Sequence, residues 1–404
     1  MLARMRTRLR KTVLLITLAL GACSEPEDRS AVLGQVDYGG HVERIEALGD
    51  YSAEEAALLL QLAGANASFS VRTGFSLQRV VYRTTGVRGE PTLVSGLVAV
   101  PASGAIKGVV SWQHGTNSFR PNSISQPSVP EGVGVAALFA SDGYLLVAPD
   151  YIGLGVSHDV HPYYHWPSTV ETTTDLLSIA ARILPALSRA PAFDVYLAGF
   201  SQGGGATAAL QRTLEADNPT PLRVRAAATL AAAFDPAGIS LANAIETDNP
   251  FFLAMIVNAL AFVHERPLED VIQAPYARQL PALFDGTHGQ ADILAHLPPH
   301  LTGLLTERFL RDFTQGVREP AWFYDALEAA RTDDYAPQAP LRICFGTRDT
   351  IVVPAEAKNA FERMRDAGGR VELHDVGPFT HDDLVVNTLP SVQRWFDELQ
   401  RSAP

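Results

Sequence analysis

Cysteine is nearly absent from this chain, which contains two cysteines, Cys23 and Cys344, in 404 residues. If Cys23 is acylated, Cys344 has no partner, and we expect a fold without disulfides. Cys344 lies in an apolar run, where a buried, unreactive thiol is expected. The sequence also has no C-x-x-C pair and no H-E-x-x-H motif. The sequence therefore has no strong metal-binding signature.

Basic residues are also fewer than acidic ones. The chain has 32 Lys and Arg and 44 Asp and Glu, which gives a net charge of −12. Removal of residues 1–22 removes five basic and no acidic residues, which takes the net charge to −17. Such an acidic chain is a poor partner for nucleic acid. It suits neutral or cationic substrates instead. The oligomeric state is not predicted by the sequence.

A long hydrophobic run is missing as well. The apolar run from Thr12 to Leu20 follows a basic segment and is too short to span a bilayer. This order predicts a signal peptide over residues 1–22, which is excluded from the fold. Leu20-Gly21-Ala22-Cys23 resembles the lipobox of bacterial lipoproteins.

That resemblance implies lipidation of Cys23 and an anchor on the membrane surface, with Ser24 favouring the outer membrane or cell surface. The alternative is an ordinary signal peptide with a secreted or periplasmic product. The polar residues 23–50 are predicted to form a tether.

Apolar strand-like runs alternate with helical patterns along the rest of the chain, which predicts an α/β fold. We expect a mostly parallel central sheet flanked by helices, built from residues 51–238 and 336–404. Residues 239–335 show helical patterns, many aromatic residues and no clear strand, and the strand pattern resumes after them. They are predicted to form a helical cap inserted into the sheet topology.

The most informative motif is Gly199-Phe200-Ser201-Gln202-Gly203. It lies between a buried-strand pattern and the small residues of a helix start. A strand, a sharp turn with Ser at its tip and a helix form the context of a nucleophile elbow, which needs small neighbours on both sides. Ser201 is therefore the predicted nucleophile.

A serine nucleophile needs a general base, and the base needs an orienting carboxylate. Asp349 follows the strand pattern 341–345, and His381 follows the strand pattern 370–376, in the chain order Ser, acid, His. Asp235 is an alternative acid, because it also follows a strand. His374 is a weaker base candidate, since it lies inside its strand.

The oxyanion of a tetrahedral intermediate needs two backbone donors. One is the N–H of Gln202, directly after the nucleophile. The loop Trp112–Thr116 follows a central strand and contains a His-Gly pair, so Thr116 N–H is the second predicted donor.

Three further side chains near this edge are candidates for the substrate pocket: His114, Asp150 and Tyr151. Each has an alternative role, in which it braces the loops by hydrogen bonds. The segment after them interleaves histidines with aromatic residues: His158, His161, Tyr163, Tyr164, His165 and Trp166. This segment is expected to line the pocket rather than to bind a metal, since no carboxylate or Cys follows at ligand spacing.

Taken together, these motifs resemble the α/β-hydrolase superfamily over nearly the whole mature chain. More narrowly, the loop motifs, the elbow and an insertion of about a hundred residues after the sixth predicted strand are similar to the secretory lipase family, of the lipase A type. The resemblance implies nucleophile, acid and base roles for Ser201, Asp349 and His381. Gln202 is a departure, because that type often has Gly there; its side chain is expected to narrow the pocket.

The predicted function is a serine esterase or lipase that acts on a small-molecule ester through an acyl-enzyme. This serine mechanism requires no cofactor. A peptidase or amidase of the same fold is the alternative, and recognition of a substrate amine would require an acidic pocket. A non-catalytic binding lipoprotein is the third possibility, against which the complete set of catalytic positions argues.

Overall fold

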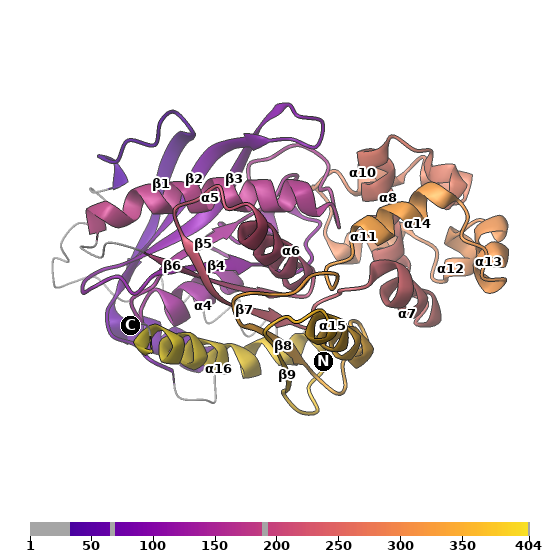
Figure 1. The fold of residues 1–404 in the computed structure, drawn as a ribbon. Coiled ribbons are helices and arrows are strands. Elements are labelled where there is room, and N and C mark those ends of the chain that lie inside the picture. Colours follow the sequence, from indigo (N-terminus) through magenta and orange to yellow (C-terminus); the bar gives the residue numbers. More distant parts are fainter. Residues whose placement is uncertain (1–32, 65–68, 188–192, 403–404) are drawn as a thin grey trace.

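The computed structural model describes residues 33–64, 69–187 and 193–402. Its centre is a nine-stranded sheet in the order β1-β2-β3-β5-β4-β6-β7-β8-β9 (Figure 1). The strands are β1 (Val42–Tyr51), β2 (Phe75–Thr85), β3 (Pro91–Pro101), β4 (Val109–Gln113), β5 (Leu145–Pro149), β6 (Asp194–Phe200), β7 (Arg223–Leu230), β8 (Leu341–Phe345) and β9 (Val371–Asp375).

The sheet combines an antiparallel edge with a parallel body. The pairs β1·β2, β2·β3 and β3·β5 are antiparallel, and every pair from β5 through β4 to β9 is parallel. This arrangement confirms the predicted α/β class and its mostly parallel sheet. Because the strands β4 to β9 run the same way, their carboxyl ends meet at one edge of the sheet.

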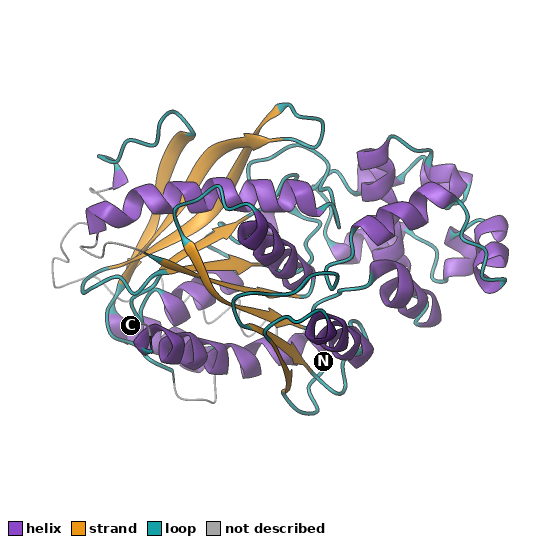
Figure 2. Ribbon diagram, in the orientation of Figure 1, coloured by secondary structure: helices purple, strands orange, loops and turns teal. Residues whose placement is uncertain are grey.

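Helices cover both faces of the sheet (Figure 2). Along β6, Val195 and Leu197 join one buried cluster, whereas Tyr196 and Ala198 join the other. Alternate residues of a strand point to opposite faces, so a strand buried on both sides is apolar throughout. One face carries α5 (Trp166–Leu187), α6 (Gln202–Ala216) and α15 (Pro354–Asp366), and the other carries α3 (Ala53–Leu62), α4 (Pro130–Phe139) and α16 (His381–Arg401).

A helical insertion separates β7 from β8 and stands to one side of the sheet (Figure 1). Its apolar side chains continue the buried cluster under α5 and α6. It contains η2 (Pro236–Ser240), α7 (Leu241–Glu246), α8 (Pro250–His264), η3 (Leu268–Asp270), α9 (Ala274–Ala277), α10 (Leu280–Leu283), α11 (Gln290–His296), α12 (Leu301–Leu304), α13 (Glu307–Thr314) and α14 (Ala321–Ala329).

The predicted tether needs correction where the structure describes it. Residues 42–50 belong to the edge strand β1, which pairs with β2, and Leu33 and Tyr38 are buried in the core. A strand at the edge of a sheet keeps charged side chains in water, so its charge resembles that of a linker. The signal peptide and Cys23 lie outside the described residues. Among the described residues, none of the helices is long and apolar enough to cross a bilayer.

Candidate active site

Ser201 lies on a tight turn that requires glycine at positions 199 and 203. It follows the last residue of β6 and precedes α6, and its backbone has φ 57° and ψ −119°, a strained conformation for a residue other than glycine. A Cβ on Gly203 would overlap the carbonyl of Gln113, and a Cβ on Gly199 would overlap that of Gly203. The two glycines are therefore required by close backbone approach.

The structure brings Ser201, His381 and Asp349 into one hydrogen-bonded chain. The Oγ of Ser201 lies 2.9 Å from Nε2 of His381, and Nδ1 of His381 lies 2.7 Å from Oδ2 of Asp349. All three residues are less than 7% exposed. A carboxylate only accepts hydrogen bonds, so Nδ1 carries the hydrogen and Nε2 is free to accept the proton of Ser201.

Each of the two partners is held by its own element. Asp349 lies on the turn after β8, where its Oδ1 accepts hydrogen bonds from the N–H groups of Ile351 and Val352, both at 2.9 Å. His381 is the first residue of α16, and its ring lies 4.7 Å from the ring of Phe200. Asp349 is therefore held by its own turn, and the ring of His381 packs on the residue before Ser201.

The two rival residues lie elsewhere. Oδ1 of Asp235 accepts hydrogen bonds from Nη2 of Arg331 at 2.6 Å and from the N–H of Gly238 at 2.8 Å. His374 stays within β9, paired in register with Cys344. Neither side chain contacts Ser201 or His381 in the described hydrogen bonds. Burial raises the pKa of the Cys344 thiol to about 12, so this cysteine is a poor nucleophile.

The two predicted oxyanion donors come from segments that lie against each other. Gln113 at the end of β4 pairs with Gly199 at the end of β6, so the loop after β4 runs beside the elbow. Gln202 is the first residue of α6, where backbone N–H groups have no partner within the helix. The hydroxyl of Thr116 lies 3.0 Å from that of Tyr163.

A cavity of about 180 Å³ opens at Ser201. It is bounded by the aromatic segment after β5, by α7 and α8 of the insertion and by the loop after β8. The lining residues are Tyr163, Tyr164, Ser201, Gln202, Ala233, Ser240, Asn243, Ala244, Thr247, Asn249, Phe252, Ile256, Thr350, Ile351 and Val352. Among these described lining residues, none has a charged side chain.

The three pocket candidates His114, Asp150 and Tyr151 do not line this cavity. The Asp150 carboxylate accepts hydrogen bonds from Ser95 Oγ at 2.6 Å and from Ser125 Oγ at 2.5 Å. The His114 ring stacks on Tyr151 at 4.1 Å, and Tyr151 donates its hydroxyl hydrogen to the His114 carbonyl. Their side chains are thus engaged in bracing the loops at this edge, which is the alternative role considered for them.

Sequence reasoning missed one buried carboxyl close to the cavity. Glu356 of α15 accepts hydrogen bonds from the N–H groups of Phe234 and Asp235 and from the hydroxyl of Ser240, at 2.9, 2.8 and 2.6 Å. Burial is the largest effect on this group and raises its pKa to about 7. Glu356 follows the helix-starting Pro354 by two residues, and a helix-start pattern does not reveal that its side chain is buried.

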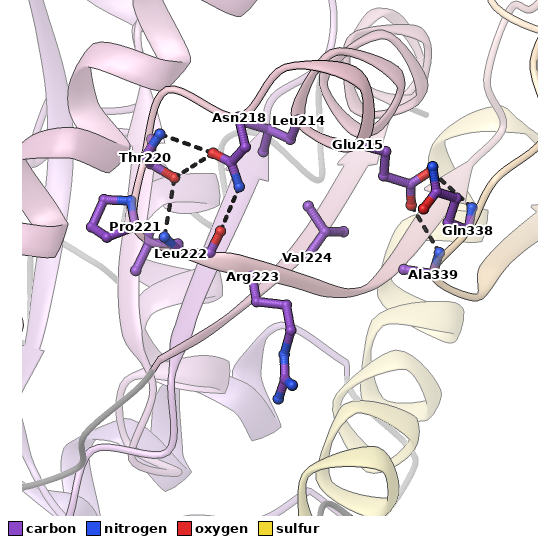
Figure 3. A pocket seen from close by; sticks show the side chains of 10 residues that line it. All are labelled: Leu214, Glu215, Asn218, Thr220, Pro221, Leu222, Arg223, Val224, Gln338 and Ala339. Carbon is purple, nitrogen blue, oxygen red and sulfur yellow. Dashed lines mark hydrogen bonds between the residues drawn. The ribbon is translucent and has the colours of Figure 1, made fainter.

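A second hollow, of about 350 Å³, lies at the opposite end of the sheet, where β7 begins (Figure 3). Its polar side chains are largely occupied by the local chain. Glu215 accepts hydrogen bonds from the N–H groups of Gln338 and Ala339, and Asn218 is bonded within its own turn. The described residues that line this hollow do not include a nucleophilic side chain in contact with a general base. In the part of the chain that the structure describes, no group of three or more His, Cys, Asp or Glu is placed to hold a metal ion.

The strand order, the strained serine turn and the chain of three side chains define an α/β-hydrolase. A family model described as "Serine aminopeptidase, S33" matches residues 133–384, more than half of the chain. The protein belongs to this family of hydrolases. No curated protein sequence matches the chain at a significant level.

Solved structures resemble the chain over most of its length. A protein of Legionella pneumophila, described as a hydrolase, has a TM-score of 0.81 at 26% identity, covering 90% of this chain and 99% of its own. The rice cell wall degrading esterase LipA of Xanthomonas oryzae has a TM-score of 0.75 at 23% identity, with 90% and 98% coverage. Lipase A of Candida antarctica in its closed state has a TM-score of 0.64 at 16% identity, with 94% and 88% coverage. The last two similarities establish the shared fold alone.

Proposed function

We propose that this protein is a serine hydrolase of small, neutral carboxylic esters. The observation that carries the proposal is the hydrogen-bonded chain from Ser201 through His381 to Asp349, which opens onto an uncharged cavity. An uncharged cavity favours a neutral ester over a charged substrate, because a buried charge without a partner is costly.

The reaction begins when His381 Nε2 takes the proton of Ser201 as its Oγ attacks the ester carbonyl carbon. Asp349 holds the ring in the required tautomer and stabilises the imidazolium. The N–H groups of Gln202 and Thr116 stabilise the negative oxygen of the tetrahedral intermediate. His381 then returns the proton to the leaving alcohol, which leaves an acyl-enzyme on Ser201. Water, activated by His381, releases the acid, and no cofactor takes part.

The insertion, residues 239–335, acts as a cap over this reaction. α7 and α8 supply one wall of the cavity, including Phe252 and Ile256. At about 180 Å³ the cavity is smaller than the 300–1,000 Å³ of common ligand pockets, which favours short acyl groups over fatty chains.

A serine peptidase or amidase of the same fold is the second candidate, and the family description favours it. A peptidase that recognises a free amine needs a carboxylate beside the substrate. The described residues that line the cavity include no carboxylate, which supports an ester substrate over a peptide substrate with a free amine. A panel of aminoacyl p-nitroanilides tests this alternative directly; their turnover above that of matched esters would make the protein a peptidase.

The test of the main proposal is hydrolysis of p-nitrophenyl esters from acetate to palmitate, with the Ser201→Ala variant alongside. We expect a maximum at acetate or butyrate and a loss of several powers of ten in kcat for Ser201→Ala. A maximum at palmitate would make the protein a lipase. No turnover of any ester, together with no labelling of Ser201 by a phosphonate, would favour a non-catalytic binding protein.

We also propose that Cys23 is lipidated and holds the protein at the outer membrane or cell surface. The lipobox-like Leu20–Cys23 and the basic segment before it support this localisation. Cys23→Ser should abolish palmitate labelling and move the protein from the membrane fraction to the soluble fraction. Membrane retention of unlabelled Cys23→Ser protein would require another anchor.

A further inference from the structure

One contact next to the nucleophile takes no part in the reaction described above. The side-chain nitrogen of Gln202 lies 2.9 Å from Nε2 of His161. Gln202 is 2% exposed and His161 is 7% exposed, so water does not compete for this hydrogen bond. The contact joins the first residue of α6 to the aromatic segment after β5.

The direction of this hydrogen bond follows from the other side of the ring. Nδ1 of His161 lies 2.9 Å from the carbonyl oxygen of Ile152, which can only accept. Nδ1 therefore carries the ring hydrogen, and Nε2 accepts from the Gln202 amide. Burial lowers the pKa of His161 to about 4, which keeps the ring in this neutral form at neutral pH.

The imidazole is itself held in place. It stacks parallel to Tyr151 at 6.1 Å and meets Tyr163 edge-on at 6.1 Å. A Cβ on Gly153 would overlap the backbone of His161, so the two parts of this segment are in close contact. His161 is thus a fixed acceptor rather than a mobile surface side chain.

The same aromatic segment also touches the other oxyanion loop. The hydroxyl of Tyr163 lies 3.0 Å from that of Thr116, and Tyr151, on which the His161 ring stacks, stacks in turn on His114. The segment therefore contacts both stretches of chain that carry the proposed oxyanion donors.

We propose that His161 is a positioning residue, which fixes the Gln202 peptide N–H toward the oxyanion by holding the Gln202 side chain. This inference rests on the proposed serine hydrolase function. Ser201, directly before Gln202, is in a strained conformation, and a strained turn keeps its geometry only when its surroundings constrain it. The His161–Gln202 hydrogen bond supplies such a constraint one residue from the nucleophile.

The test compares variants at both ends of the contact. Gln202→Met keeps the length of the side chain and the backbone N–H but removes the side-chain amide. His161→Phe keeps an aromatic ring at this position but removes the Nε2 acceptor. We expect each variant to lower kcat about tenfold and to change KM by less than about twofold. Complete removal of an oxyanion donor lowers kcat a hundredfold or more, and a misplaced donor should cause only a part of that loss. The affinity for a trifluoromethyl ketone, whose adduct places an O⁻ between these donors, should fall by the same factor as kcat.

Three controls separate positioning from stability. Gln202→Met removes the buried Oε1, which has no hydrogen-bond partner among the described residues, but leaves Nε2 of His161 without its donor. The two effects oppose each other, so Tm should change little. His161→Gln, which retains an acceptor, should restore most of the kcat lost in His161→Phe. His165→Phe changes a half-buried histidine of the same segment that bonds Ser168 and is not among the residues that line the cavity, so it should keep kcat.

The double variant of His161→Phe and Gln202→Met should lose no more kcat than either single variant, because both break one interaction. Additive losses, or losses confined to KM, would overturn the proposal. If His161→Phe does not fold, Gln202→Met decides alone, and an unchanged kcat in that variant contradicts the inference. Absence of wild-type ester turnover overturns the proposed function instead, so the two failures are distinct.

Discussion

At the scale of single residues, the site depends on two glycines as much as on the reactive side chains. Gly203 faces the Gln113 carbonyl so closely that no Cβ fits. Elsewhere, Gly134 lies within α4 with nothing within 4 Å of the position of a Cβ, and its backbone φ is not positive. The same substitution at these two positions therefore has opposite effects.

Gly203→Ala is expected to lower the free energy of unfolding by about 2–4 kcal/mol, because the elbow backbone must shift. Gly134→Ala is expected to raise it by about 0.5–1 kcal/mol, since alanine favours the helix. Urea unfolding of the two variants beside the wild type measures both. Equal stability of the Gly203→Ala variant would show that the elbow tolerates a side chain.

The two candidate acids can be separated by one matched pair of variants. Asp349→Asn keeps an oxygen for the Ile351 and Val352 N–H groups but no longer orients His381, so kcat should fall by about three to four powers of ten. Asp235→Asn removes only the charge that pairs with Arg331, and kcat should stay within about threefold. A larger loss of kcat in Asp235→Asn than in Asp349→Asn would reverse the assignment.

At the scale of elements, α15 joins the sheet to the insertion through Glu356. Its folded-state pKa of about 7 lies above the ordinary value of 4.5. Between these values the folded protein keeps a proton that the unfolded chain releases. The contribution of Glu356 to stability is therefore full below pH 4.5 and is lost as the pH rises through 7.

Replacement of this carboxyl should remove the pH dependence. Glu356→Gln imitates the protonated form, so its stability relative to the wild type should rise by on the order of 2–3 kcal/mol between pH 4.5 and pH 8. Chemical unfolding at four or five pH values measures the difference. A difference that does not change with pH would mean that Glu356 titrates normally.

The helix α8 sets the far wall of the cavity. Phe252 lies there half-buried, so Phe252→Ala should enlarge the cavity at little cost in stability. The ratio of kcat/KM for the octanoate ester to that for the acetate ester is expected to rise about tenfold or more, since each accommodated methylene contributes to transition-state binding. An unchanged ratio would place the acyl group elsewhere.

The sequence predicted the parallel body of the sheet well, because buried strands such as β6 and β8 are short apolar runs between helix patterns. It missed β1, whose charged residues at the sheet edge resemble a linker, and it did not predict α4. The candidate nucleophile, acid and base were predicted from their order after strands, and their three side chains lie in hydrogen-bonded contact. The contacts of Glu356 and of His161 were not predicted, because each depends on residues that the fold alone brings together.

At the scale of the whole molecule, the chain has a net charge of −12, whereas the described residues that line its cavity carry no charge. A negative field attracts cations and has little effect on neutral molecules. Raising the salt from 0.02 to 0.5 M should lower kcat/KM for a choline ester about twofold to fivefold and leave that for the matched neutral ester unchanged. Equal salt effects on the two esters would rule out steering by the acidic surface.

The two ends of the helical insertion lie against each other. Arg331 forms an ion pair with Asp235 at 2.6 Å, and the N–H of Thr332 donates to the carbonyl of Phe234 at 3.0 Å. An inserted segment whose entry and exit points coincide can be exchanged without moving the strands that flank it. The helices between Asp235 and Arg331 can thus be replaced by those of a relative, in evolution or by design. Such a replacement would change which substrates enter the cavity, while Ser201, His381 and Asp349 keep their positions.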